Sequence, residues 1–123
     1  MTVRRLKTYA SNQGLVFQYY FVGQRSAVSM PESPVATPTE EYIFDVTSDR
    51  KTKVPLRILL PGESVVQWAH DHGRELTGPE RYAAVKMRLF RAFDEVENLL
   101  RPGCELTVTA DMLEDVLRQL GVD

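Results

Sequence analysis

The segment at residues 15–22, Leu-Val-Phe-Gln-Tyr-Tyr-Phe-Val, constrains the fold most, because every position except Gln18 is apolar or aromatic. A run of this length rich in aromatic and β-branched residues is typical of a β-strand. Successive side chains of a strand point to opposite faces, so this strand carries large apolar groups on both. The rest of the chain must therefore supply something to contact each face.

The composition is that of an ordinary globular domain. Of the 123 residues, 43% are hydrophobic and 26% are charged, which is enough for one core. We therefore expect a single domain over residues 1–123. A net charge of -2 gives no general attraction for polyanions, so nucleic acid is not the expected partner. No run approaches the ~20 apolar residues of a membrane-spanning helix, so no membrane role is predicted.

The single cysteine, Cys104, cannot form an internal disulfide, which fits a reducing compartment and predicts a cytoplasmic protein. The alternative is a signal peptide, in which basic residues such as Arg4 precede the apolar stretch 15–22. Gln18 and Tyr20 make that stretch too polar, and its pattern suits a strand better.

The first 60 residues predict two hairpins. Residues 3–10 and 15–22 flank the polar cluster 11–14, which ends in Gly14 and suits a tight turn. Residues 41–47 and 54–60 flank the polar segment 48–53, and Pro55 either marks a sheet edge or lies at the start of its strand. Between the hairpins, residues 29–39 contain three prolines and predict an extended surface loop, or alternatively a lid.

From residue 61 onward the apolar period changes from two to 3.6, which predicts helices. Ser64 and Gln67 fit a capping box, and Gly73 fits a helix end, so we expect a helix over 65–72. Thr77 and Glu80 form a second capping box, which opens a helix to about residue 98.

The last part of the chain predicts a short strand at 106–108 and a helix capped by Thr109. Because the strands precede the helices, the fold class is α+β: an antiparallel four- to five-stranded meander sheet with three helices packed on one face. Each helix carries one apolar stripe, so none is left to cover the second face of the sheet.

Strand alternation assigns side chains to the two faces. The larger apolar set is predicted to face the helices: Leu15, Phe17, Tyr19, Phe21, Tyr42, Phe44, Val46, Val54, Leu56, Ile58 and Leu60. The opposite, open face would carry Arg5, Lys7, Tyr9, Val16, Gln18, Tyr20, Val22, Ile43, Asp45, Arg57 and Leu59. A register with Val46 opposite Leu56 would pair Asp45 with Arg57 across the strands.

The open face is the main candidate for function. Large exposed apolar patches are unusual on monomers, and a symmetric dimer is the commonest cover. Tyr9 and Tyr20 would anchor such an interface. The alternative is a solvated face, because antiparallel sheets often leave one side to water.

The long helix carries its charges in an unusual order. Arg81, Arg88 and Arg91 lie before Glu95 and its acidic neighbours, the reverse of what the helix dipole favours. Two such helices packed antiparallel would match basic with acidic halves, which makes these four residues interface candidates. The alternative is a solvated helix with pairs such as Arg91 with Glu95.

No motif predicts catalysis, a metal or a cofactor. His70 and His72 are two apart on a helix and do not face the same way, and Cys104 has no placed base. We therefore expect a non-catalytic protein that forms a homodimer or binds a protein partner. The alternatives are a small-ligand or enzyme site on the open face under the 29–39 loop, marked by a pocket with Gln18, Tyr20 and Arg57, and a nucleic-acid site.

Overall fold

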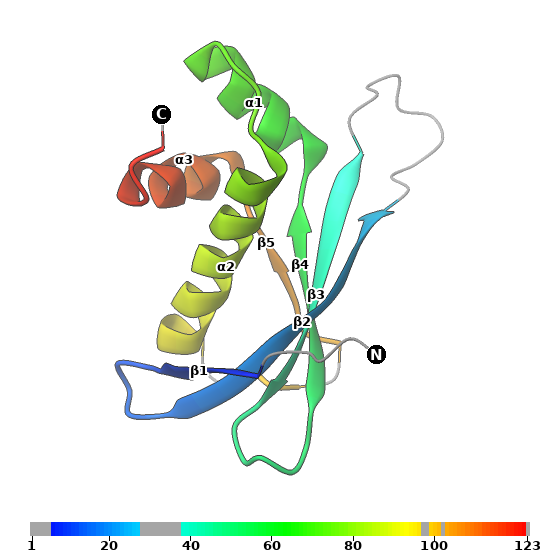
Figure 1. Cartoon of the computed structure of the whole chain (residues 1–123), viewed down its shortest axis with the longest axis vertical. Coiled ribbons are helices and arrows are strands. Elements are labelled where there is room, and N and C mark those ends of the chain that lie inside the picture. The colour runs from blue at the N-terminus through cyan, green and yellow to red at the C-terminus, as the bar shows by residue number, and fades with distance from the viewer. Residues whose placement is uncertain (1–5, 28–37, 97–98, 102, 123) are drawn as a thin grey trace.

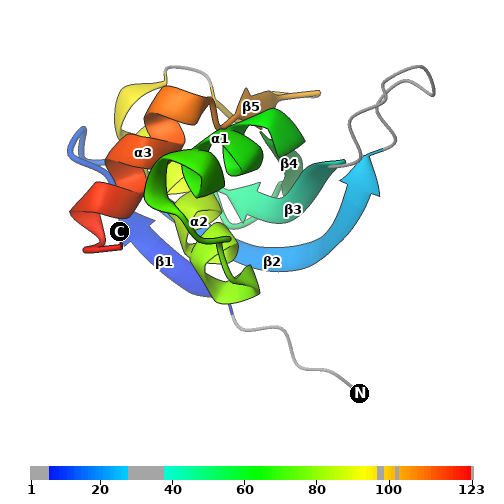
Figure 2. The same cartoon turned by 90° about the horizontal axis from the view of Figure 1, so that it is seen from above.

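The computed structural model describes residues 6–27, 38–96, 99–101 and 103–122. Along the chain they form β1 (Lys7–Ala10), β2 (Val16–Ala27), β3 (Thr39–Thr47), β4 (Val54–Leu60), α1 (Gly62–His72), α2 (Gly78–Glu95), β5 (Glu105–Thr107) and α3 (Ala110–Gln119). One sheet holds the strands in the order β1-β2-β3-β4-β5 (Figure 1). The three helices gather on one side of this curved sheet (Figure 2). The predicted α+β class is confirmed, while most of the predicted 29–39 loop lies outside the described residues.

The last strand departs from the predicted meander. β1 to β4 pair antiparallel in sequence order, but β5 pairs parallel with β4, with Arg57 opposite Glu105. The chain passes through α1 and α2 between these two strands. A crossover of this kind returns the chain to the sheet in the same direction, which a short hairpin cannot do.

The turn between β1 and β2 is one residue longer than predicted. Ser11 N–H donates to the carbonyl of Leu15 at 2.8 Å, so the turn covers residues 11–15 and Tyr9 lies opposite Phe17. A shift of one residue moves every side chain of a strand to the other face. Lys7 and Tyr9 therefore face the helices, contrary to the prediction, and Leu15 is 51% exposed in the turn instead of packed in the core.

The core otherwise follows the predicted faces. Phe17, Tyr19, Tyr42, Phe44, Val46, Leu56, Ile58 and Leu60 are buried, together with Val85, Leu89 and Phe93 of α2 and Leu113, Val116 and Leu117 of α3. One predicted core residue, Phe21, lies at its margin and is 36% exposed. Burial thus falls off where β2 passes beyond the helices.

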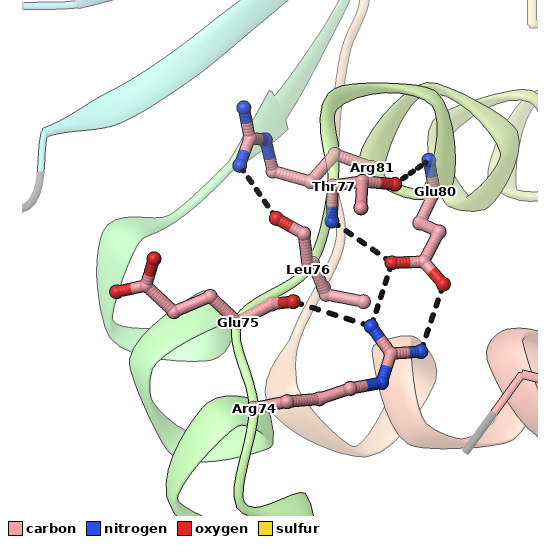
Figure 3. A network of polar contacts seen from close by, with 6 residues as sticks. All are labelled: Arg74, Glu75, Leu76, Thr77, Glu80 and Arg81. Atoms are coloured by element: carbon pink, nitrogen blue, oxygen red, sulfur yellow. Dashed lines mark hydrogen bonds and ion pairs between the residues drawn. The ribbon is translucent and has the colours of Figure 1, made fainter.

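The start of α2 is built as predicted. Thr77 Oγ1 accepts from Glu80 N–H at 3.3 Å, and Glu80 Oε1 accepts from Thr77 N–H at 2.8 Å, which completes a capping box. Arg74 donates to both carboxylate oxygens of Glu80, at 2.9 and 2.8 Å (Figure 3). These contacts, Arg74 first, lower the pKa of Glu80 to about 2. The α1–α2 junction is therefore fixed by charge as well as by backbone hydrogen bonds.

The predicted start of α1 is wrong. The helix begins at Gly62 after Pro61, and Ser64 is a buried helix residue whose Oγ donates to the Val108 carbonyl at 3.1 Å. Pro61 is the N-cap and has no side-chain acceptor, and its carbonyl accepts the first backbone hydrogen bonds of the helix, from Ser64 N–H at 3.0 Å and from Val65 N–H at 3.3 Å. Gly73, with φ 70°, ends α1 as predicted, Thr109 caps α3, and α2 ends at Glu95, short of residue 98.

Candidate functional site

The side of the sheet away from the helices carries eight of the predicted candidates: Val16, Gln18, Tyr20, Val22, Ile43, Asp45, Arg57 and Leu59. We call this side the open face. Val16 is 47% exposed, whereas Val22, Ile43 and Leu59 are half-buried. The apolar surface that the described residues offer here is therefore modest.

A ladder of alternating charges crosses the open face over four strands. Arg25 Nη2 of β2 lies 3.0 Å from Glu41 Oε1 of β3, and Glu41 Oε2 lies 3.8 Å from Arg57 Nη1 of β4. Arg57 Nη2 then lies 2.5 Å from Glu105 Oε2 of β5. The two guanidinium groups cover Glu41, whose side chain is only 5% exposed. Most of the charge on this part of the face is thus compensated within the chain.

The predicted pair of Asp45 with Arg57 does not form. The two residues share the open face, but Asp45 lies opposite Pro55 and Arg57 lies opposite Ile43, two residues away from the predicted register. Asp45 instead accepts a hydrogen bond from the Tyr20 hydroxyl at 2.7 Å, and Lys53 Nζ lies 5.0 Å from the centre of the Tyr20 ring. Tyr20 is therefore held by neighbours on its own sheet.

Tyr9 belongs to the helix side and not to the open face. Its ring stacks on Phe90 of α2 at 4.7 Å, and its hydroxyl donates to Asp94 Oδ2 at 2.7 Å. This hydrogen bond raises the pKa of Tyr9. Asp94 Oδ1 also accepts from the Asn12 backbone N–H at 2.9 Å. An acidic residue near the end of α2, which the helix dipole disfavours, is thus explained by its contacts with the β1–β2 hairpin.

Three arginines of α2 form ion pairs or hydrogen bonds with other elements of the chain. Arg81 Nε lies 3.4 Å from Glu40 Oε2, Arg88 Nε donates to the Thr107 carbonyl at 3.1 Å, and Arg91 pairs with Asp115 of α3. Arg91 therefore pairs with α3 and not with Glu95, which is exposed. These contacts already engage the three arginines within the chain. The structure therefore gives little support to the prediction that α2 helices of two copies pair through their basic halves.

The histidines and the cysteine have local roles. His72 Nε2 lies 2.7 Å from Glu114 Oε2, its ring stacks on Trp68 at 4.2 Å, and Cys104 is buried. Among the residues that the structure describes, no three His, Cys, Asp or Glu side chains are grouped to hold a metal ion. None of the described helices is long and apolar enough to cross a membrane.

Three surface hollows lie away from the predicted ligand position. The largest, of about 440 Å³, lies between the two hairpin turns and the segment after α2, and a second lies beside residues 48–54. The third lies between the starts of α1 and α3. None of these three is lined by Gln18, Tyr20 or Arg57, so they do not favour a ligand site on the open face.

The far part of β2 extends beyond its pairing with β1. β2 is 12 residues long, but β1 pairs only with residues 16–19. The outer backbone edge of residues 21–27 has no strand partner within the described part of the chain, and we call it the free edge. The sequence did not predict this edge, because the apolar run that marks the strand ends at Val22. A bulge between Phe21 and Gly23 lets β2 continue, and a glycine inside a strand is the available signal for such a bulge.

Comparisons with family models, curated proteins and solved structures found no match to this chain.

Proposed function

We propose that this chain is a non-catalytic protein that acts by protein–protein interaction, and that it forms a homodimer through the free edge of β2. Residues 21–27 of two copies would pair antiparallel about a twofold axis. One observation carries the proposal: β2 extends well beyond β1, so its outer hydrogen-bonding groups lack a strand partner within the described residues. Such an edge is a template for pairing with another strand.

The side chains along the free edge permit two copies to approach. The charged group here, Arg25, is held by Glu41, and Gln24 Nε2 donates to Glu40 at 3.1 Å. Two copies can therefore meet without opposing uncompensated charges, which would otherwise disfavour pairing. The 36% exposed Phe21 adds apolar surface beside the same edge.

The position and shape of the edge also support a second strand. The far end of β2 lies along the outside of the sheet, away from the helices (Figure 1, Figure 2). The bulge between Phe21 and Gly23 limits the registers in which a partner can pair. A twofold axis makes the contact isologous and closed, so it ends at a dimer. The proposal keeps the cytoplasmic location, which the buried, unpaired Cys104 supports.

Size-exclusion chromatography with light scattering at tens of micromolar tests this proposal. The wild-type chain should elute with the mass of a dimer. The double variant Val22→Lys with Ser26→Lys should shift to monomer, because lysines on an edge oppose strand pairing. The control is Val66→Lys on α1, where the native side chain is 45% exposed, and it should stay dimeric.

A monomeric wild type contradicts the proposal. A dimer that resists both edge lysines, with folding of the variant verified by circular dichroism, contradicts the use of this edge.

A further inference from the structure

A lysine interrupts the aromatic stripe of α2. Tyr82, Lys86 and Phe90 lie at successive i+4 positions and so share one side of the helix, the side that meets β1 and β2. Lys86 Nζ lies 5.8 Å from the ring centre of Tyr82, 5.7 Å from that of Phe90 and 5.9 Å from that of Tyr19. These distances are typical of cation–π contacts. A cation thus occupies a position that the pattern would give to an apolar residue.

A second lysine lies next to the first. Lys7 is opposite Tyr19 in the β1–β2 register and faces the same side of the sheet. Burial, and then contact with the Lys7 amine, lower the pKa of Lys86. We call Lys7 and Lys86 the amine pair. Two like charges in contact repel each other, so the arrangement favours a counter-charge between them.

The chain itself does not supply this counter-charge within its described residues. Neither Lys7 nor Lys86 makes an ion pair with a described carboxylate, although Arg81 and Arg91 of the same helix each do. Lys86 lies between these two arginines along α2, so its distance from the helix ends does not explain why it lacks an ion pair within the described residues. Lys86 therefore differs from these arginines, because it lies against aromatic rings and beside the Lys7 amine of β1.

We propose that the amine pair binds an oxyanion, the phosphate or carboxylate group of a ligand. The anion would accept hydrogen bonds from both ammonium groups, and charge-assisted bonds of this kind are among the strongest in proteins. The rings of Tyr19, Tyr82 and Phe90 form an apolar wall behind Lys86, which strengthens the attraction by excluding water on that side. This site does not depend on the proposed dimer.

Titration of pyrophosphate, and separately of citrate, into the full chain tests the proposal. The lysine CεH₂ resonances, followed by NMR, should show Lys7 and Lys86 shifting together to saturation, and binding should weaken as salt rises. Lys86→Gln and Lys7→Gln should each weaken binding about tenfold, whereas Lys86→Arg, which keeps the charge, should retain it. Saturation by pyrophosphate alone assigns the site to phosphate groups, and saturation by both assigns it to oxyanions in general.

The matched control is Lys53→Gln. Lys53 also lies over a tyrosine ring, that of Tyr20, whose hydroxyl donates to the Asp45 carboxylate on the open face. Its loss should leave binding unchanged. Shifts that do not saturate, or equal weakening by Lys53→Gln and Lys86→Gln, would overturn the proposal by showing only general attraction to a cationic surface.

Discussion

The two parts of β2 differ in what lies beside them. At residues 16–19, β1 closes the outer edge, and Phe17 stacks on Phe93 of α2 at 4.4 Å. At residues 21–27 the outer edge has no strand partner among the described residues, and Phe21 is 36% exposed although it belongs to the same apolar run. The run is equally apolar in both parts. Whether a residue of β2 is buried therefore depends on whether β1 and α2 extend over it. The proposed interface lies in the part of β2 that they leave uncovered.

Removing a ring should show the largest difference between the two parts. Phe93→Ala empties a fully packed position, 1% exposed, and should lower the free energy of unfolding by about 3–5 kcal/mol. Phe21→Ala should cost about 1 kcal/mol in the monomer, because much of that ring is already in water. Urea unfolding measures both values, and similar losses would break the comparison.

Two tyrosine–aspartate hydrogen bonds give a finer test. The Tyr9 hydroxyl joins β1 to Asp94 of α2, and the Tyr20 hydroxyl joins β2 to Asp45 of β3, both at 2.7 Å. Tyr9→Phe keeps the stacking on Phe90 and should cost about 1–2 kcal/mol, because the bond joins segments that no ladder connects. Tyr20→Phe should cost about 0.5 kcal/mol, because the two strands stay paired without it.

Thermal or urea unfolding of the two single variants distinguishes these values. If Tyr20→Phe loses as much stability as Tyr9→Phe, the hydrogen bond between Tyr9 and Asp94 does not stabilise the fold more than the one between Tyr20 and Asp45.

Local patterns predicted the elements well. The bounds of β4 and the capping box at Thr77 follow from neighbouring residues alone, and both are confirmed. The alternation of β3 and β4 likewise placed Phe44 and Leu56 in the core. These features depend on a few adjacent side chains, which a sequence displays directly.

Features set by one residue of register, or by distant partners, could not be predicted. The extra turn residue, Leu15, reversed the sides of Lys7 and Tyr9, because strand side chains alternate with a period of two. The partner of Arg57 is Glu105, which reaches it only because the crossover brings β5 beside β4. To predict the free edge, one would need to know both where β1 begins and that a bulge lets β2 continue beyond Val22.

The smallest expected effect concerns the α1–α2 junction, on the side of the sheet that the helices cover. The pKa of Glu80 is lowered from 4.5 to about 2, so its charge stabilises the fold above pH 4.5 and this contribution is lost as the pH falls from 4.5 towards 2. The stabilities of wild type and Glu80→Gln should therefore differ at neutral pH and converge near pH 2. Glu75→Gln is the control, because its carboxylate takes no part in the network of Figure 3. A constant difference between wild type and Glu80→Gln across this range, followed by urea unfolding, would contradict this role for the Glu80 charge.

Hydrogen–deuterium exchange of β2 at two protein concentrations tests the central claim most directly. If the free edge pairs with a second copy, amides in residues 21–27 should exchange more slowly at the higher concentration, while those in residues 16–19, already paired with β1, stay unchanged. Exchange in residues 21–27 that is identical at both concentrations, in a range where light scattering shows the mass changing from monomer to dimer, would contradict the account.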